Sequence, residues 1–381
     1  MKKNVIRCFK ILSLVLAVSL TLGVLQFFIF NHTDHNSQRL KGFYLEDKES
    51  LDLVLLGASE VYADYAPGYA YAHSGVTSYL FASQANSILS YKSQLKNILS
   101  RQNPDLIVIE LNGAVYGDNE ADEITKAENL HFYADNVPLD TVKLDYILHT
   151  VPEDQAEYLF PFIKYHGAWE ELESSPKYRR TVAQDEARGY SYLKGILNVT
   201  DIFSTPEISF NSDLPDYADD TLPLTAAAEE ALRDLLQYCK DEGLNNVVFA
   251  RFPHIVVTRN YERFQRSNRV GQIVAEYGFD YLNLERDVAL TGLDEKNDFY
   301  NLEHLNVYGQ KKFTAYLTDY LIERYGLKPH PLDADDQEEW DTCARWYDAY
   351  YRYSDELIQK GDSRELSEDS DLIAALKPYL Q

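Results

Sequence analysis

Two side chains in this sequence have the types and the order of a nucleophile and its base. Ser59 follows an apolar segment and Gly57, and His304 lies 245 residues further on, just before an amphipathic segment. A serine hydroxyl becomes a useful nucleophile only when a base within hydrogen-bonding distance takes its proton. A histidine on a loop before a helix suits this role, because its pKa lies near neutral pH. The pair therefore indicates acyl-transfer chemistry.

Each of these residues also has a simpler interpretation. Gly57-Ala58-Ser59 is compatible with a tight strand-to-helix turn in which the serine caps the helix. His304, taken alone, is compatible with a surface or helix-capping histidine. The segment reads Gly-x-Ser-x-Val and lacks the second glycine of the Gly-x-Ser-x-Gly elbow, which argues against an α/β-hydrolase. If Ser59 is the nucleophile, backbone N–H groups of this turn are placed to stabilise an oxyanion.

The elements that must position Ser59 and His304 are predicted from apolar runs and from helical periodicity. Short runs rich in β-branched residues indicate strands buried on both faces, as in a parallel sheet. They occur at residues 51–56, 106–111, 246–250 and 280–284. Amphipathic helical patterns occur at residues 83–99, 225–242, 263–277 and 307–325. This alternation predicts a three-layer α/β domain whose ligand site lies at the carboxyl ends of the strands.

Polar side chains follow one of these predicted strands directly. Arg251 and His254 come after residues 246–250, so we expect them at the same edge of the sheet as Ser59. There they are placed to bind a sugar hydroxyl or an acid, and an exposed loop role is the alternative. No spacing of His, Cys and Asp residues argues for a catalytic metal, and no glycine-rich phosphate loop occurs, so we predict neither metal nor cofactor.

The amino-terminal residues predict a membrane anchor. Residues 1–10 are basic and predict a short cytoplasmic tail, whereas residues 11–30 carry no charge. About twenty apolar residues, at about 1.5 Å each, span a hydrocarbon core of about 30 Å. A cleaved signal peptide is the alternative, although no small-x-small cleavage pattern follows the apolar run. We therefore expect a single-pass protein of the cell membrane with an extracytoplasmic domain from about residue 31 onward.

The remaining chain divides by composition. Residues 31–50 are polar and predict a spacer above the membrane, and residues 51–327 predict the α/β domain. Within this domain, residues 118–220 break the alternation of strands and helices and are too long for a plain loop. We expect them to form a helical insertion that caps the site. Residues 328–381 are acidic and rich in tyrosine and tryptophan, and they predict a helical extension on the domain edge.

The net charge and the cysteine content limit the classes of binding partner and the disulfide bonds that we expect. The 381 residues include 61 acidic against 36 basic ones, for a net charge of -25. This balance argues against nucleic acid or an anionic membrane surface as a partner. Three cysteines are too few for a disulfide framework. Cys239 is expected on an apolar helix face, and a Cys239–Cys343 bridge stays open as an alternative.

Several segments resemble the sequence blocks of the SGNH (GDSL-like) hydrolase superfamily. Residues 55–62 with Pro67 resemble its first block, a strand followed by Gly-x-Ser, and residues 301–309 resemble its last block, a histidine ahead of a helix. Residues 73–79 resemble the glycine turn of the second block, and residues 103–111 resemble the strand of the third. The resemblance implies a flavodoxin-like three-layer α/β/α fold with a parallel sheet.

The resemblance also implies roles for individual residues. Ser59 takes the place of the nucleophile and His304 that of the base. Asn301 stands three residues before the histidine, where the family often has aspartate. Its amide oxygen accepts an imidazole N–H bond and orients the ring, but it does not stabilise the imidazolium as a carboxylate does, so Asp298 is a second candidate. The candidates for oxyanion or substrate binding are Gly75, Asn112 and Arg251.

More narrowly, the chain resembles the membrane-anchored SGNH-like proteins that accompany membrane-bound O-acyltransferases in bacterial polysaccharide acylation. This resemblance implies transfer of an acyl group, acetyl above all, to an exported or cell-surface glycan. It also implies a multi-pass O-acyltransferase as the partner that delivers the acyl group. A carbohydrate esterase results if water reaches the acyl-enzyme. The alternative from another class is a non-catalytic accessory protein that binds glycan or organises the membrane partner.

Overall fold

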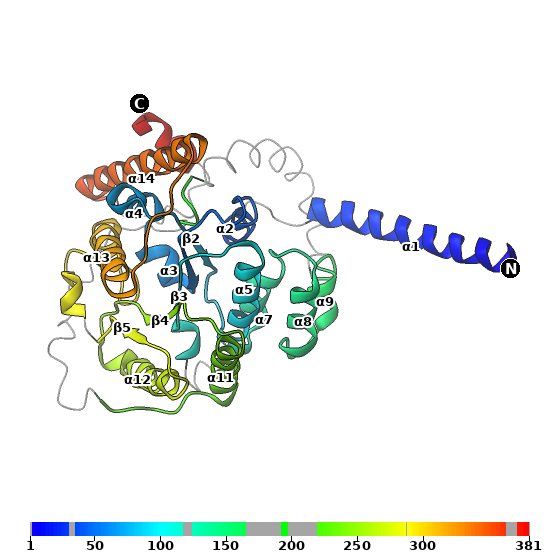
Figure 1. The fold of residues 1–381 in the computed structure, drawn as a ribbon, viewed down its shortest axis with the longest axis horizontal. Coiled ribbons are helices and arrows are strands. Elements are labelled where there is room, and N and C mark those ends of the chain that lie inside the picture. The colour runs from blue at the N-terminus through cyan, green and yellow to red at the C-terminus, as the bar shows by residue number, and fades with distance from the viewer. Residues whose placement is uncertain are drawn as a thin grey trace.

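The computed structural model describes residues 2–29, 35–116, 124–164, 192–196, 219–286, 288–362 and 372–380. Helix α1 (Lys2–Ile29) contains a stretch, Asn4–Val24, that is long and apolar enough to cross a membrane. The helix extends away from the sheet, with almost all of its described side chains exposed (Figure 1). The stretch starts earlier than the predicted span, residues 11–30, because the basic first residues are also helical. Length and composition support an anchor and a cleaved signal peptide alike.

In the described part of the chain, five strands form one parallel sheet, which confirms the predicted α/β class. The order is β2-β1-β3-β4-β5, and every neighbouring pair is parallel. Because the order reverses between β1 and β3, ligands of such a sheet bind in the crevice outside the carboxyl ends of these strands. The strands are β1 (Leu53–Gly57), β2 (Ser78–Ala82), β3 (Leu106–Glu110), β4 (Val247–Arg251) and β5 (Tyr281–Asn283).

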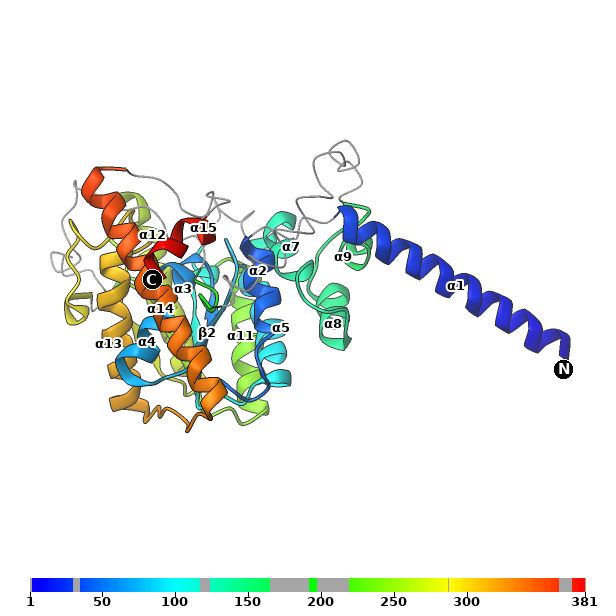
Figure 2. The ribbon, with the colours of Figure 1, turned by 90° about the horizontal axis from the view of Figure 1, so that it is seen from above.

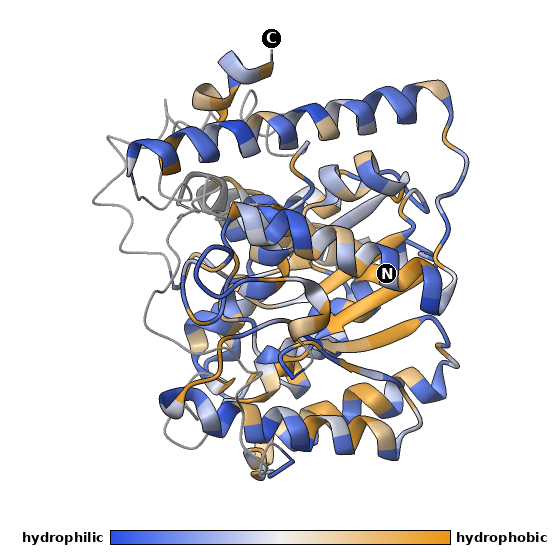
Figure 3. Ribbon diagram, turned by 90° about the vertical axis from the view of Figure 1, so that its left-hand side faces the viewer, coloured by the Kyte–Doolittle hydropathy of each residue, from blue (hydrophilic) through white to orange (hydrophobic). Residues whose placement is uncertain are grey.

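Helices cover both faces of the sheet. Alternate strand residues point to opposite faces. Val54 and Leu56 therefore join a core with α2 (His35–Phe43), α5, α11 and α12, whereas Leu53 and Leu55 join one with α3, α4, α13 and α14. Figure 3 shows the hydrophobic strands between helices whose outer faces are hydrophilic. The helices are α3 (Ser59–Asp64), α4 (Pro67–Ser74), α5 (Ile88–Arg101), α11 (Ala226–Asp241), α12 (Tyr261–Glu276), α13 (Val307–Tyr325) and α14 (Ala334–Lys360).

The edge strand β2 and the helix that covers it correct two predictions. β2 has no counterpart among the predicted strands, and residues 31–50 are not a plain spacer, because helix α2 (His35–Phe43) packs on β2. Leu40 and Phe43 of α2 are fully buried, and the Tyr79 hydroxyl donates a hydrogen bond to Arg39 O at 2.8 Å. These apolar contacts explain why a polar-looking segment joins the domain.

The predicted insertion, residues 118–220, is described in part. Helices α7 (Ala127–Ala134), α8 (Thr141–His149) and α9 (Gln155–Leu159) stand on the α5 side of the sheet (Figure 1). The segment 192–196 returns to the edge of the sheet, where Leu80 N donates to Lys194 O at 3.1 Å. The rest of the insertion lies outside the described residues.

The carboxyl-terminal residues form helices on the opposite face. Helix α14 lies across α4 (Figure 2), so closely that a Cβ on Gly68 would be 2.6 Å from Cys343 O. Two short elements follow, α15 (Leu372–Leu376) and a 3-10 turn (Lys377–Leu380). Cys239 and Cys343 are both free and buried, on α11 and α14 respectively. The disulfide left open by the sequence is therefore not formed.

Candidate active site

Ser59 is the first residue of α3, which places it at the carboxyl edge of β1. The last residue of β1, Gly57, makes this turn sterically possible. A Cβ there would lie 2.6 Å from Val61 Cγ2 and 2.9 Å from Glu110 Cβ. Ala58 is the N-cap of α3, and no side chain caps this end of the helix. The helix-capping interpretation of Ser59 is therefore wrong, and the hydroxyl is left for other partners.

His304 lies on a tight loop between Phe299 and Leu305, which form an antiparallel bridge. The side-chain oxygen of Asn301 accepts hydrogen bonds from the backbone N–H of Glu303 (2.7 Å) and of His304 (2.9 Å). The same oxygen lies 3.1 Å from His304 Nδ1. Two backbone donors identify this atom as the amide oxygen, so Nδ1 is the donor. In the neutral imidazole, Nε2 therefore carries the free lone pair.

The surroundings of His304 suit a general base. The Tyr300 ring stacks on the imidazole, with centroids 5.4 Å apart and an interplanar angle of 13°. Burial lowers the pKa of His304, and the carboxylates of Glu60 and Glu303 offset this in part. Within the described part of the chain, its buried Nε2 has no hydrogen-bond partner. Because Asn306 caps α13, His304 is not a capping residue, and within the described residues no hydrogen bond uses the lone pair of its Nε2, which a general base needs.

Two contacts connect α3 with the His304 loop. Leu305 N donates to Asp64 Oδ1 at 2.8 Å, which ties the loop to the last residue of α3. Glu60 is fully buried, and its charge and that of His304 shift one another's pKa. Ser59 Oγ lies 3.5 Å from Glu60 Oε2. Ser59 Oγ therefore contacts a carboxylate whose charge also acts on His304, and within the described residues no hydrogen bond joins Ser59 to His304.

Glu60 is the centre of a buried hydrogen-bond network. Its Oε1 accepts a hydrogen bond from Asn112 Nδ2 and lies 3.4 Å from His254 Nε2. The other ring nitrogen of His254 lies 2.8 Å from Phe252 O, so both ring nitrogens face oxygen atoms. Burial alone would raise the pKa of Glu60, but the His254 hydrogen bond and the charges of His304, His254 and Arg251 lower it. Glu60 is therefore an ionised carboxylate inside the protein.

Arg251 joins this network to two further carboxyl groups. Its Nη1 donates to Asn112 Oδ1, and its Nη2 and Nε lie 3.1 and 3.3 Å from the Glu285 oxygens. The carboxyl of Glu110 lies 3.6 Å away and accepts a hydrogen bond from Asn112 N at 2.9 Å. Burial and the charge of Glu60 raise the pKa of Glu110, so Glu110 keeps its proton where Glu60 is ionised.

One predicted site residue, Gly75, lies at the opposite edge of the sheet. It ends α4 with φ +80° before β2 begins, so in a parallel sheet it is on the amino side. The turn at the carboxyl end of β2 is residues 83–87, where Ala85 takes the left-handed conformation with φ 44°. In this turn Asn86 Nδ2 donates to Gly57 O at 2.8 Å. The glycine of residues 73–79 therefore terminates a helix and does not contribute to an oxyanion site.

Asp298 is not placed to orient the imidazole. Its buried carboxylate lies 2.8 and 2.9 Å from Lys312 Nζ, and one oxygen accepts a hydrogen bond from Asp294 N at 2.7 Å. These partners hold the loop on α13, and Asn301 is the residue in contact with His304. The prediction that Asp298 could replace an aspartate beside the histidine is therefore wrong.

Three carboxyl groups of the network were absent from the predicted site. Glu60, Glu110 and Glu285 are buried beside Asn112 and Arg251, two residues that were predicted there. Each of the three follows or ends a strand: Glu110 is the last residue of β3, and the other two lie within three residues of a strand end. An acidic residue at the carboxyl end of a buried apolar run was the signal that could have identified them.

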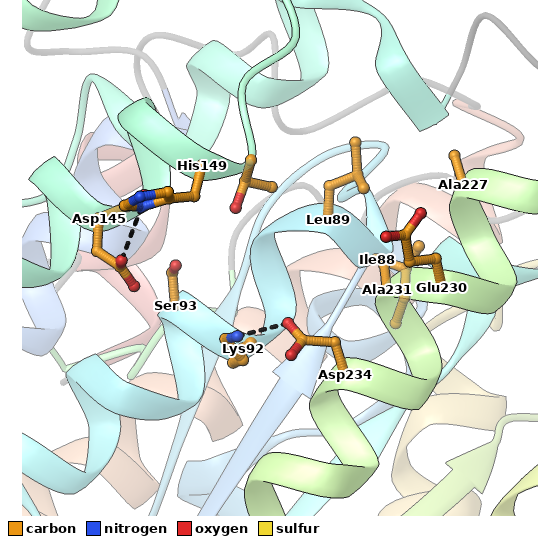
Figure 4. A pocket seen from close by; sticks show the side chains of 11 residues that line it. Ile88, Leu89, Lys92, Ser93, Asp145, His149, Ala227, Glu230, Ala231 and Asp234 are labelled. Atoms are coloured by element: carbon orange, nitrogen blue, oxygen red, sulfur yellow. Dashed lines mark hydrogen bonds and ion pairs between the residues drawn. The ribbon is translucent and has the colours of Figure 1, made fainter.

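A pocket of about 440 Å³ shares no residue with this network. It lies between α5, α8 and α11, and two pairs of its lining side chains interact (Figure 4). Lys92 Nζ lies 2.5 Å from Asp234 Oδ2, and His149 Nδ1 lies 3.0 Å from Asp145 Oδ1. Among the residues that the structure describes, no cluster of three or more His, Cys, Asp and Glu side chains is arranged to hold a metal ion.

Two comparisons with known proteins were made for the whole chain. Neither a scan against protein-family models nor a search of curated proteins finds a match to the chain. The chemistry of the site is therefore argued from its own residues.

Proposed function

We propose that this protein transfers an acyl group, acetyl above all, through an acyl-enzyme on Ser59. The observation that carries the proposal is the contact of Ser59 Oγ with the ionised, buried Glu60 carboxylate. The charge of Glu60 also acts on His304, whose buried Nε2 has no partner among the described residues. Buried polar atoms are normally paired, and perturbed groups of this kind gather at functional sites. A nucleophile, a base and a charge that favours the imidazolium are the parts of a serine acyl-transfer site.

The proposed reaction has two halves. In the first, Ser59 Oγ bonds to the acyl carbon of a donor while its proton passes to His304 Nε2 and then to the leaving group. In the second, His304 Nε2 takes the proton of an acceptor hydroxyl, whose oxygen bonds to the acyl carbon as the bond to Ser59 Oγ breaks and the serine regains a proton. Asn301 holds the imidazole by its Nδ1, and Glu60 supplies the negative charge that an amide lacks.

The fold and the membrane helix support the wider setting of the proposal. The strand order 2-1-3-4-5 is that of flavodoxin-like sheets, which bind ligands at the β1/β3 switch point, and it agrees with the resemblance to SGNH hydrolases. Helix α1 supports attachment to a membrane. Following the resemblance, we propose that the domain lies outside the cytoplasm, with an exported or cell-surface glycan as acceptor and a multi-pass O-acyltransferase as the source of the acyl group.

Covalent labelling of Ser59 tests the proposal. The full chain in detergent is treated with a fluorophosphonate, which bonds to an activated serine with loss of fluoride, and the labelled peptide is identified by mass spectrometry. We expect labelling to be abolished in Ser59→Ala and slowed at least about a hundredfold in His304→Ala, while the matched control Ser74→Ala labels normally. Because the pKa of His304 is lowered, the rate should begin to fall only below the ordinary histidine value of 6.5 as the pH decreases.

A non-catalytic role in organising a membrane acyltransferase is the second candidate. It is favoured by one observation, that Ser59 Oγ contacts Glu60 and not His304. A folded wild-type chain that shows no labelling at Ser59 would overturn the acyl-enzyme and favour this role. If Ser59 is labelled, p-nitrophenyl acetate separates the remaining activities: an esterase releases acetate to water, whereas a transferase forms more product when a glycan supplies hydroxyl groups.

A further inference from the structure

A pocket of about 340 Å³ adjoins the His304 loop and takes no part in the chemistry above. It lies between the loop after β4 and the loop that carries His304, which are joined where Ile255 N donates to Leu302 O at 2.8 Å. Asn301 belongs to the pocket and also contacts the imidazole. We call it the Arg259 pocket, and its lining residues are Arg259, Asn260, Arg263, Asn301, Leu302 and Glu303.

The charge of the Arg259 pocket is opposite to that of the chain. The whole protein has a net charge of -25, whereas the pocket has two guanidinium groups and one carboxylate. Arg263 Nη1 lies 2.5 Å from Glu303 Oε1, and its guanidinium stacks 5.1 Å from the Tyr116 ring centroid, so its position is fixed. Arg259 is exposed and makes no hydrogen bond or ion pair with the residues that the structure describes. A cation is therefore free to bind a ligand.

Apart from the second carboxylate oxygen of Glu303, the polar groups left open in the pocket are hydrogen-bond donors. The Asn260 side chain is used on both sides, accepting from Val257 N at 2.7 Å and donating to Ile255 O at 3.0 Å. The Asn301 oxygen is used by the His304 loop, which leaves its NH2 group without a partner among the described contacts. Helix α12 also begins beside the pocket, with the positive end of its dipole there. Donors and positive charge suit an oxyanion.

We propose that the Arg259 pocket binds an anionic group, a carboxylate or a phosphate, carried by the saccharide that receives the acyl group. The inference rests on the proposed function, because His304 must contact the acceptor hydroxyl when the acyl-enzyme breaks down. Asn301 contacts Nδ1 of the imidazole and also lines the pocket, so the pocket adjoins the Nδ1 side of the proposed base, and we assign to it the charged substituent of the saccharide. The strong negative charge of the chain repels anionic polymers elsewhere, which makes this pocket the point of recognition.

Binding of three matched sugars tests the pocket without any acyl donor. Glucuronate, glucose 6-phosphate and glucose are titrated against the full chain in detergent, with binding followed by ligand-detected NMR. We expect an anionic sugar to bind at least about tenfold more tightly than glucose, since a charge-assisted hydrogen bond contributes about 1.5–3 kcal/mol. Arg259→Ala should remove this preference, whereas Arg345→Ala, which removes an exposed arginine on α14, should preserve it. Glu303→Gln should tighten binding a few-fold by removing the one carboxylate.

The outcomes separate the two proposals and the two ligand classes. Preference for glucuronate identifies a carboxylate, and preference for glucose 6-phosphate identifies a phosphate. Anionic sugars that bind no better than glucose, or a preference that survives in Arg259→Ala, would overturn the pocket inference whatever the labelling of Ser59 shows. If Ser59 is never labelled while Arg259-dependent binding persists, the acyl-enzyme proposal is contradicted and the anion-site proposal is supported.

Discussion

Two buried ionic clusters in this protein differ in how their polar atoms are paired. One is the Glu60 network at the carboxyl edge of the sheet, and the other surrounds Lys194 beside β2. Lys194 Nζ lies 2.8 and 3.0 Å from the two oxygens of Glu46 and 2.5 Å from Glu339 Oε1. It also stands 4.8 Å from the Trp340 ring centroid. Each of the three ammonium hydrogens therefore has an acceptor.

The Glu60 network leaves atoms unpaired. Within the described residues, His304 Nε2, Glu110 Oε1 and Asp64 Oδ2 are buried without a hydrogen bond. Each unpaired buried atom costs about 1–3 kcal/mol. Of these three residues, Glu110 belongs to the network, and Asp64 and His304 interact with the charge of Glu60. The comparison indicates that the Lys194 cluster serves the structure, by fixing the segment 192–196 on β2, whereas the Glu60 network keeps groups available for a ligand.

The largest effect is expected from removing the cation of the fully paired cluster. Lys194→Ala leaves the buried Glu46 carboxylate without its partner, and breaking a buried pair in this way costs about 3–5 kcal/mol. Denaturant unfolding of the full chain measures this loss. The matched control is Lys92→Ala, which breaks the exposed pair with Asp234 and should cost about 0–1 kcal/mol. Equal losses in the two variants would contradict a structural role for the Lys194 cluster.

The next effect comes from neutralising the centre of the unpaired network. In Glu60→Gln the carboxylate that favours the His304 imidazolium is lost, so we expect fluorophosphonate labelling of Ser59 to slow on the order of a hundredfold. Labelling is measured at neutral pH on protein with an unchanged unfolding midpoint. The control is Glu339→Gln in the Lys194 cluster, which should label at the wild-type rate.

A carboxylate placed on the Nδ1 side of His304 tests whether Glu60 acts through the charge of the imidazole or only stabilises the fold. Asn301→Asp places a carboxylate oxygen where the amide oxygen now lies 3.1 Å from His304 Nδ1. In the Glu60→Gln background it should recover much of the lost labelling rate, because either carboxylate stabilises the same imidazolium. If the Asn301→Asp substitution gives no recovery while Glu60→Gln stays folded, Glu60 acts only as a structural partner of Asn112 and His254.

The strands show which parts of the fold the sequence could predict. Residues 106–111 and 246–250 are continuous apolar runs, and they form β3 and β4 within one residue of the predicted bounds. Strand β2 was not predicted because its burial depends on α2 and on the segment 192–196, which cover it from distant parts of the chain. Local pattern predicts a strand only where the strand supplies its own apolar character on both faces.

The site residues divide in the same way, into those predicted from adjacent residues and those that depend on distant parts of the chain. Ser59 and Asn301 were identified from their places before a helix and before a histidine, and these are properties of a few adjacent residues. The sequence pattern did not single out the carboxylate of Glu60. Its partners Asn112 and His254 are 52 and 194 residues away, so its burial and ionisation follow only from the order of the strands.

The smallest expected effect tests whether an unpaired atom of the network carries a cost that depends on pH. Burial raises the pKa of Asp64 well above its ordinary value, and only its Oδ1 is hydrogen-bonded, by Leu305 N. As pH rises above the ordinary carboxyl range, the unfolded chain releases this proton while the folded chain retains it, so folding stability falls.

Asp64→Asn cannot ionise and keeps the Oδ1 acceptor. Its melting temperature relative to wild type should therefore rise between about pH 5 and about pH 8, where 1 kcal/mol corresponds to about 2–4 °C. A difference that stays constant over this range would mean that Asp64 is already ionised in the folded protein, and the network would then hold its charges by pairing, as the Lys194 cluster does.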